Sequence, residues 1–252
     1  KVAIAVTLRL GGQVEVWRGR KRLEFGLDEK TVRGEKFRIV TMNGKRLGFT
    51  DQFGAHWEPW MAYREFWSNC RDEGGDILST TEQPEIRARE TQVVIRCAAL
   101  EKVHEGRGDV VLTSAPLATL PGLEIHSGRS KYVFYRGIRV AETPSKRESL
   151  YTYNLTWAQT LTEDRTLKYT WSLPTELAKA IVQCSDASIL TGVLTADTDH
   201  LEAHLPWADV RDQTPSPQFM HTAEYLYRND KLRGSAIKLF KEYLDKIPGY
   251  DS

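Results

Sequence analysis

The chain has 252 residues, of which 40% are hydrophobic and 27% are charged, and its 35 basic and 34 acidic residues leave a net charge of +1. This length and composition exclude a disordered chain and predict a folded protein with one large core or two small ones. The nearly balanced charge excludes a general electrostatic attraction to nucleic acid or anionic lipid, so any site for a polyanion must be local.

The cysteines and the hydropathy pattern indicate a reducing compartment. Cys70, Cys97 and Cys184 lie in apolar segments without Cys-x-x-Cys spacing, which favours buried thiols over disulfides or a metal site. No apolar run approaches the ~20 residues of a membrane span, and no secretory signal opens the chain. We therefore expect a cytoplasmic protein that makes no membrane contact.

The first 53 residues predict one helix followed by antiparallel strands. Residues 1–10 have the pattern of the middle of a helix without a preceding cap, so we expect the chain to be a fragment. Gly11-Gly12 ends this helix and the sequence then alternates as a strand over residues 13–18. Further strands are predicted at residues 22–27 and 36–41, with turns at residues 28–30 and at Asn43-Gly44.

An aromatic-rich helix is predicted to begin at Pro59 and to end at Gly74. At the helical period, one face of this helix carries an aromatic stripe and the opposite face carries a polar stripe. We expect the aromatic stripe to pack against strands around Val94 and Phe134. The aromatic stripe is Trp60, Tyr63, Trp67 and Cys70, and the polar stripe is Glu65, Asn69 and Asp72. The polar stripe has two open interpretations. It is either a solvated face, or a nucleotide site, because its Glu-x-x-x-Asn-x-x-Asp spacing resembles the helix that lines the ATP site of GHKL-type ATPases.

The middle of the chain predicts more strands. Residues 91–96 read as a strand before a short helix at residues 98–104, and residues 131–140 form the strongest strand pattern, with Gly137 indicating a bulge or a close backbone approach. A second compact polar cluster, Leu-Thr-Glu-Asp-Arg-Thr, occupies residues 161–166.

Four segments in order carry a resemblance to a known family. They are the Trp-Met-Ala-Tyr-Arg-Glu helix from Trp60, Tyr-Arg-Gly-Ile-Arg-Val from Tyr135, Ser-Leu-Tyr-Thr-Tyr-Asn from Ser149, and the cluster at residues 161–166. Together they are similar to the C-terminal half of phage-encoded, rIIA-like ATP-binding proteins of the GHKL superfamily, over about residues 1–168. The resemblance implies an α+β fold in three parts: the end of a Bergerat-type α/β sandwich (1–53), an S5-like β-α-β transducer domain (54–213) and a C-terminal helical segment (214–252).

The resemblance also implies candidate site residues. In GHKL enzymes with such a transducer, a basic side chain reaches the γ-phosphate of ATP, and Arg136, Arg165 and Lys168 are the candidates here. Glu163-Asp164-Arg165 is alternatively a plain charged turn. ATP and Mg²⁺ would bind in the full-length protein, in the host cytoplasm. Glu65, Asn69 and Asp72 are the candidate cofactor ligands, although the resemblance places their helix in the transducer domain, where the likeness to an ATP-site helix would be coincidental.

The last third predicts a helix at residues 173–185, a strand at residues 189–195 and helices within residues 219–247, broken near Arg233-Gly234. His200 and His204 have helical spacing but lack the His-Glu-x-x-His order, so we predict no metal site. Basic residues near the C-terminus are interleaved with acidic ones, which favours a solvated face and leaves nucleic-acid binding open.

Three functions remain open. The first is the transducer half of an ATP-driven switch, which would be inactive by itself and could form a homodimer. The second is a non-catalytic module that binds protein or nucleic acid. The third is a hydrolase that uses Glu65 and Asp72 as an acid-base pair.

Overall fold

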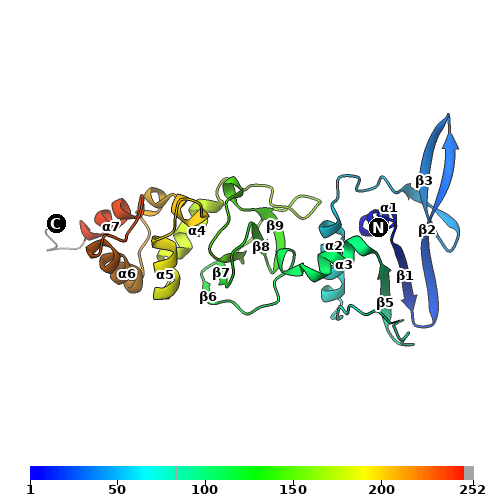
Figure 1. The fold of residues 1–252 in the computed structure, drawn as a ribbon, viewed down its shortest axis with the longest axis horizontal. Coiled ribbons are helices and arrows are strands. Elements are labelled where there is room, and N and C mark those ends of the chain that lie inside the picture. Colours follow the sequence, from blue (N-terminus) through cyan, green and yellow to red (C-terminus); the bar gives the residue numbers. More distant parts are fainter. Residues whose placement is uncertain (83, 247–252) are drawn as a thin grey trace. The chain divides into compact units, whose positions relative to one another are not determined.

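The computed structural model describes residues 1–82 and 84–246 and divides the chain into two compact units, Lys1–Val110 and Val111–Ser252. Each unit has its own five-stranded sheet and its own helices (Figure 1). The α+β class predicted from the sequence is confirmed. The Bergerat-type and S5-like folds, and the domain boundaries after residues 53 and 213, stay predictions.

The first unit contains three α-helices and one antiparallel sheet in the order β4-β3-β2-β1-β5. Its elements are α1 (Val2–Arg9), β1 (Gln13–Arg18), β2 (Lys21–Val32), β3 (Glu35–Met42), β4 (Lys45–Thr50), α2 (Pro59–Asp72), β5 (Thr91–Arg96), α3 (Ala98–Glu105) and the 3₁₀ turn η1 (Arg107–Asp109). The predicted first helix, the following strand and the Asn43-Gly44 turn are confirmed.

Helix α1 packs on the sheet through a small apolar cluster that includes Ala5, Leu8 and Val40. The glycine pair explains how the chain leaves the helix. Gly11 has a φ of +78°, and a Cβ on Gly12 would lie only 2.7 Å from the Cβ of Cys97. Only a residue without a side chain permits this close packing between the end of α1 and the segment that follows β5.

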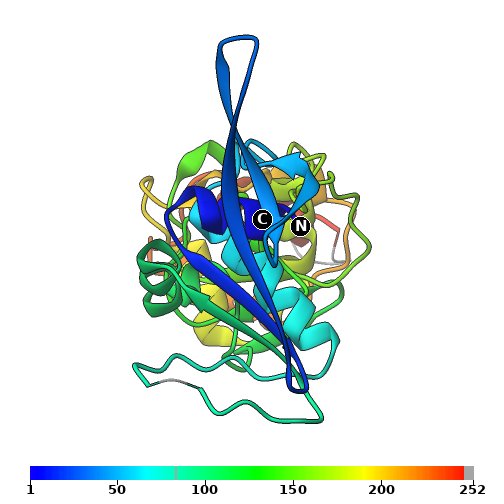
Figure 2. The same cartoon turned by 90° about the vertical axis from the view of Figure 1, so that its right-hand side faces the viewer.

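The predicted turn at residues 28–30 is wrong, because β2 runs through it. Asp28, Glu29 and Lys30 pair with Ile39, Arg38 and Phe37 of β3, and the turn lies instead at Arg33-Gly34, with φ values of 52° and 85°. Beyond Phe25 and Ile39, β2 and β3 pair in the described structure with each other alone, and Figure 2 shows this two-stranded ribbon extending past the rest of its sheet. Cross-strand pairing therefore overrides the turn propensity of an Asp-Glu-Lys run.

Helix α2 begins at Pro59, as predicted, and Gly74 follows its end with a φ of +72°. Tyr63 is buried, whereas Trp60 and Trp67 are half-buried. The main partners of α2 are α1 and α3, where the Tyr63 hydroxyl lies 2.9 Å from Nδ1 of His104. The expected burial of the whole aromatic stripe is wrong, since Trp60 and Trp67 are only half-buried and the buried face of α2 is rotated toward Ala62, Arg64 and Ser68.

The second unit contains a sheet in the order β6-β7-β10-β8-β9, in which only the β10–β8 pair is parallel. Its elements are β6 (Ala118–Leu120), β7 (Leu123–His126), β8 (Tyr132–Tyr135), β9 (Ile138–Glu142), η2 (Pro144–Lys146), β10 (Thr152–Leu155), α4 (Leu173–Val182), α5 (Ala187–Leu194), η3 (Leu201–His204), η4 (Trp207–Val210), α6 (Pro217–Arg228) and α7 (Ala236–Leu244).

Two strand predictions in this unit are wrong. Residues 131–140 form the β8–β9 hairpin rather than one strand, because Arg136-Gly137 adopts the two-residue turn with φ values of 51° and 80°. The strand predicted at residues 189–195 is instead helix α5 up to Leu194, and Asp186 caps this helix by accepting hydrogen bonds from the backbone N–H groups of Ser188 and Ile189. A short apolar run fits a buried helix as well as a strand, and here packing in the main core together with the Asp186 cap favours the helix.

The main core of the second unit joins one face of its sheet to the helices that follow. Leu123, Ile125, Tyr153 and Leu155 supply the sheet side, and α4 to α7 supply the other. The predicted helices at residues 173–185 and 219–247 are present as α4 and as the pair α6 and α7, although Ile247 lies outside the described residues.

Candidate functional site

The polar stripe of α2 is only partly assembled. Asn69 Nδ2 donates a hydrogen bond to Glu65 Oε1 at 3.2 Å, as helical neighbours four residues apart can. Glu65 is half-buried, whereas Asn69 and Asp72 are exposed. Within the described residues, no three His, Cys, Asp or Glu side chains gather as metal ligands would. The stripe therefore presents one hydrogen-bonded pair and one exposed carboxylate.

Arg136 lies in the tight turn that joins β8 to β9. Its backbone N–H donates to the carbonyl of Leu155 at 3.1 Å, and the N–H of Gly137 donates to Asn154 Oδ1 at 2.8 Å. These two bonds fix the turn to the end of β10. The guanidinium group lies 5.1 Å from the ring centroid of Tyr135, and the residue is exposed.

Arg165 lies in a second turn, formed by residues 161–168 and called here the 161–168 turn. Leu161 and Leu167 form a bridge at its base, and Thr162 and Thr166 close it with a backbone hydrogen bond of 2.9 Å and a hydroxyl contact of 2.8 Å. The Arg165 N–H donates to the carbonyl of Thr162 at 3.0 Å, and Arg165 has a φ of 55°.

The 161–168 turn is attached to strand β9. The N–H of Leu167 donates to the carbonyl of Val140 at 2.9 Å, and the Leu167 side chain is buried in the core. Lys168 follows, with its ammonium group 5.4 Å from the ring of Tyr169. β9 is an edge strand, and Arg136 lies in the turn that leads into it. The structure therefore places Arg136, Arg165 and Lys168 on turns along one edge of the second sheet.

This edge can hold an anion by its chemistry. Guanidinium groups donate bidentate hydrogen bonds to phosphate, and an ammonium group adds a point charge. Two aromatic residues, Tyr169 and Trp171, follow the 161–168 turn and were not predicted as site residues. Tyr169 is 52% exposed and Trp171 is 80% exposed. In the sequence, the one signal for these two residues is an aromatic pair within a polar stretch.

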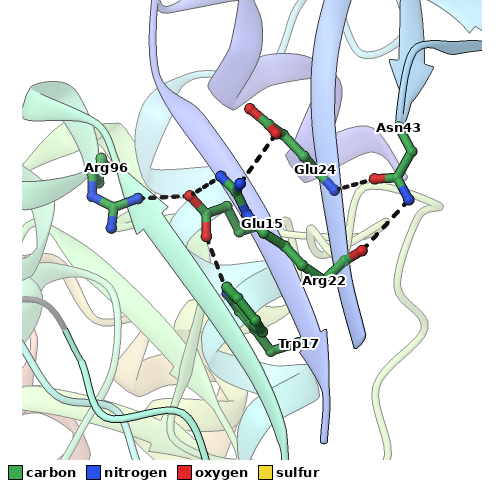
Figure 3. A network of polar contacts seen from close by, with 6 residues as sticks. All are labelled: Glu15, Trp17, Arg22, Glu24, Asn43 and Arg96. Atoms are coloured by element: carbon green, nitrogen blue, oxygen red, sulfur yellow. Dashed lines mark hydrogen bonds and ion pairs between the residues drawn. The ribbon is translucent and has the colours of Figure 1, made fainter. Parts of the chain in front are cut away.

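An ion cluster around the buried Glu15 carboxylate on the first sheet was also missed (Figure 3). The Glu15 carboxylate accepts hydrogen bonds from Arg22 at 2.8 Å, from Arg96 at 3.0 Å and from Trp17 Nε1 at 3.0 Å. The hydrogen bond from Arg22 is the largest cause that lowers the pKa of Glu15 below its ordinary value. The carboxylate thus stays ionised and ties β1 to β2 and β5, which is a structural role.

Glu202 is a second buried acid, fully enclosed at the start of η3. Its Oε1 accepts hydrogen bonds from the Tyr153 hydroxyl at 2.7 Å and from the Leu150 N–H at 2.9 Å, while Oε2 has no hydrogen-bond partner in the described structure. Burial raises the pKa of Glu202. The neighbouring histidines contact backbone carbonyls, His204 at Thr198 and His200 at Glu148.

Comparisons with protein-family models, curated proteins and solved structures find no match for this chain. Of the helices that the structure describes, none is long and apolar enough to cross a lipid bilayer. The fold class and the geometry above therefore stand on this chain alone.

Proposed function

We propose that this chain supplies the transducer half of an ATP-driven conformational switch of the GHKL type, encoded by a phage. The family resemblance motivates the proposal, and the 161–168 turn is the observation that carries it. In this role Arg165 would reach the γ-phosphate of ATP bound by the full-length protein with Mg²⁺, and Arg136 and Lys168 would add positive charge at the same sheet edge.

The backbone at Arg165 supports this role. A left-handed conformation costs a residue with a side chain roughly 1–2 kcal/mol, and glycine or asparagine usually occupies such positions. Arg136 has the same conformation at the neighbouring turn. Strained residues concentrate at functional sites because the surrounding structure holds their side chains in place. A guanidinium group on a turn fixed at Leu167 is therefore preorganised for charge that develops on a transferring phosphoryl group.

Replacing Arg165 by alanine in the full-length protein should lower ATP turnover at least tenfold, about 1.4 kcal/mol of transition-state stabilisation. Arg165→Lys should recover only part of this loss, because an ammonium group cannot form a bidentate guanidinium contact. Steady-state phosphate release measures the effect.

Two variants control for the backbone. Arg165→Gly keeps the left-handed conformation without strain, so it should lose turnover as Arg165→Ala does if the side chain is what matters. Arg33→Ala removes an exposed arginine that also has a left-handed φ, of 52°, and should leave turnover unchanged. Wild-type turnover in Arg165→Ala would show that the 161–168 turn is an ordinary charged turn.

The 252-residue chain by itself should bind ATP weakly or not at all. The sequence contains no Asp-x-Gly-x-Gly strand end for adenine and no Gly-rich lid for the phosphates. Titration with a fluorescent ATP analogue and Mg²⁺ measures this. Micromolar binding that is lost in Glu65→Ala or Asn69→Ala would instead place a nucleotide site on α2.

The second candidate function is a non-catalytic interaction module. Trp171 and Tyr169 favour it, because exposed aromatic side chains dominate the energetics of protein interfaces. A protein partner, a second copy of the chain or nucleic acid would then bind beside the 161–168 turn. The Arg165 series separates the two functions, since an interaction module requires no ATP turnover.

A further inference from the structure

One face of the second sheet carries polar side chains that are nevertheless buried. His126 and Glu124 on β7 lie opposite Thr152 and Asn154 on β10, and His126, Thr152 and Asn154 are all less than 9% exposed. The alternate residues Leu123, Ile125 and Tyr153 point into the apolar core. Because side chains alternate between the two faces of a strand, the polar set lies on the face away from that core.

The segment of residues 111–117 crosses this polar face. At one end Val111 forms a bridge to Ile138 of β9, and at the other the N–H of Leu117 donates to the carbonyl of Ile125 of β7 at 2.7 Å. Since β8 and β10 lie between β9 and β7, the segment must pass over them. Ser114 is in its middle, exposed to solvent but in contact with the buried histidine.

The polar side chains form a continuous series of contacts. Ser114 Oγ lies 3.4 Å from Nδ1 of His126. Nε2 of His126 has no hydrogen-bond partner in the described structure and lies 3.5 Å from Oε2 of Glu124. Asn154 Nδ2 donates to the same carboxylate oxygen at 2.6 Å, while its Oδ1 accepts from the N–H of Gly137 at 2.8 Å. The imidazole ring thus lies between an accessible hydroxyl group and a carboxylate that is itself oriented by the Asn154 amide.

We propose that Ser114, His126 and Glu124 form a serine-nucleophile site that hydrolyses small carboxylic esters. A hydroxyl group beside an imidazole that is oriented by a carboxylate is the arrangement that activates serine on unrelated folds. The contacts of 3.4 and 3.5 Å are longer than those of a working triad, and such contacts commonly shorten when substrate binds. The site is independent of the proposed role in an ATP-driven switch.

The reaction has two balanced steps. In the first, Ser114 Oγ forms a bond to the ester carbonyl carbon and its proton passes to Nδ1 of His126; the ester C–O bond then breaks, and the leaving alcohol takes that proton. In the second, a water molecule gives a proton to Nδ1 and its oxygen bonds to the acyl carbon; Ser114 Oγ then leaves and recovers the proton. Ester and water become acid and alcohol. Glu124 stabilises the imidazolium form at Nε2 in both steps.

Labelling of the full 252-residue chain with a fluorophosphonate probe, followed by peptide mass spectrometry, tests the proposal. The probe should modify Ser114, and the chain should hydrolyse p-nitrophenyl acetate. Ser114→Ala should abolish the labelling at this position and reduce hydrolysis at least tenfold. This variant changes an exposed side chain, so circular dichroism should show an unchanged fold.

Two further variants sharpen the test. Ser127→Ala removes an exposed serine next to His126 in the sequence and should keep both labelling and hydrolysis. Glu124→Gln keeps the size of the side chain but removes its charge, so it should slow labelling of Ser114 without abolishing it. An unlabelled wild-type Ser114, or equal hydrolysis by wild type and Ser114→Ala, would overturn the proposal.

Discussion

Replacing Phe219 by alanine should lower the free energy of unfolding by about 3–5 kcal/mol, as deletion of a large aromatic side chain from a core does. Phe219 is 1% exposed, and its ring centroid lies 6.2 Å from those of both Trp207 and Tyr243. The ring therefore packs between η4, α6 and α7. Its removal leaves a cavity that these three elements cannot all move in to fill. Urea unfolding of the full chain, followed by circular dichroism, measures the loss.

Tyr225→Ala is the matched control for this change. Tyr225 lies on the same helix but is 58% exposed, so its truncation should alter the stability by less than about 0.5 kcal/mol. If Phe219→Ala and Tyr225→Ala had equal stability, the packing of the Phe219 ring against Trp207 and Tyr243 would not stabilise the fold as described.

The buried acid Glu202 should make the stability of the protein fall as the pH rises. Burial raises its pKa in the folded state above the ordinary value of 4.5, and the hydrogen bond from Tyr153 only partly offsets this. Folding therefore favours the protonated carboxyl group. The stability that this group contributes is fully present below about pH 4.5 and is lost as the pH rises through the raised pKa.

Glu202→Gln should remove this pH dependence. The amide oxygen can still accept from the Tyr153 hydroxyl and the Leu150 N–H, but the side chain no longer ionises. As the pH increases from 4 to 8, the free energy of unfolding of the variant should rise relative to that of wild type. The rise should be about 1.4 kcal/mol for each unit by which folding raises the pKa of Glu202. Urea unfolding at a series of pH values measures the difference between the two proteins.

A constant difference between wild type and Glu202→Gln across that pH range would show that Glu202 does not titrate differently on folding. Glu163→Gln supplies the comparison, because it makes the same chemical change at an exposed position on the 161–168 turn. Its unfolding curves should follow those of the wild type at each pH.

The elements with local signals were predictable from the sequence. The glycine pair ended α1, Pro59 began α2, the alternation over residues 13–18 predicted β1, and the β-branched run within residues 91–96 predicted β5. Each of these signals lies within a few residues of the feature that it specifies, so no knowledge of distant contacts was required.

The wrong predictions arose where distant contacts decide the local structure. Residues 28–30 carry turn-forming side chains, but their partners on β3 hold them in a strand. Residues 189–195 are apolar and β-branched, yet they lie in a helix that packs within the main core of the second unit. Burial and pairing outweigh intrinsic propensities of a few tenths of a kcal/mol per residue.

The candidate sites also differ in whether a local sequence pattern or the folded chain specifies them. Arg136, Arg165 and Lys168 came from a linear motif, and their common sheet edge depends on one backbone bond, from Leu167 to Val140. The contact between Ser114 and His126 had no linear signal, because the path of residues 111–117 across the sheet brings the two together. Register and loop paths of this kind are properties of the folded chain.

The free part of the β2–β3 ribbon has a consequence for the solution behaviour of the protein. Residues 27–32 and 35–37 have backbone N–H and C=O groups along two edges that no further strand covers in the described structure, and such edges can add a strand from another molecule. Glu29, Lys30 and Lys36 are exposed along these edges. An incoming strand would have to remove water from these charges, so they act as a barrier to aggregation at the most extended part of the first sheet.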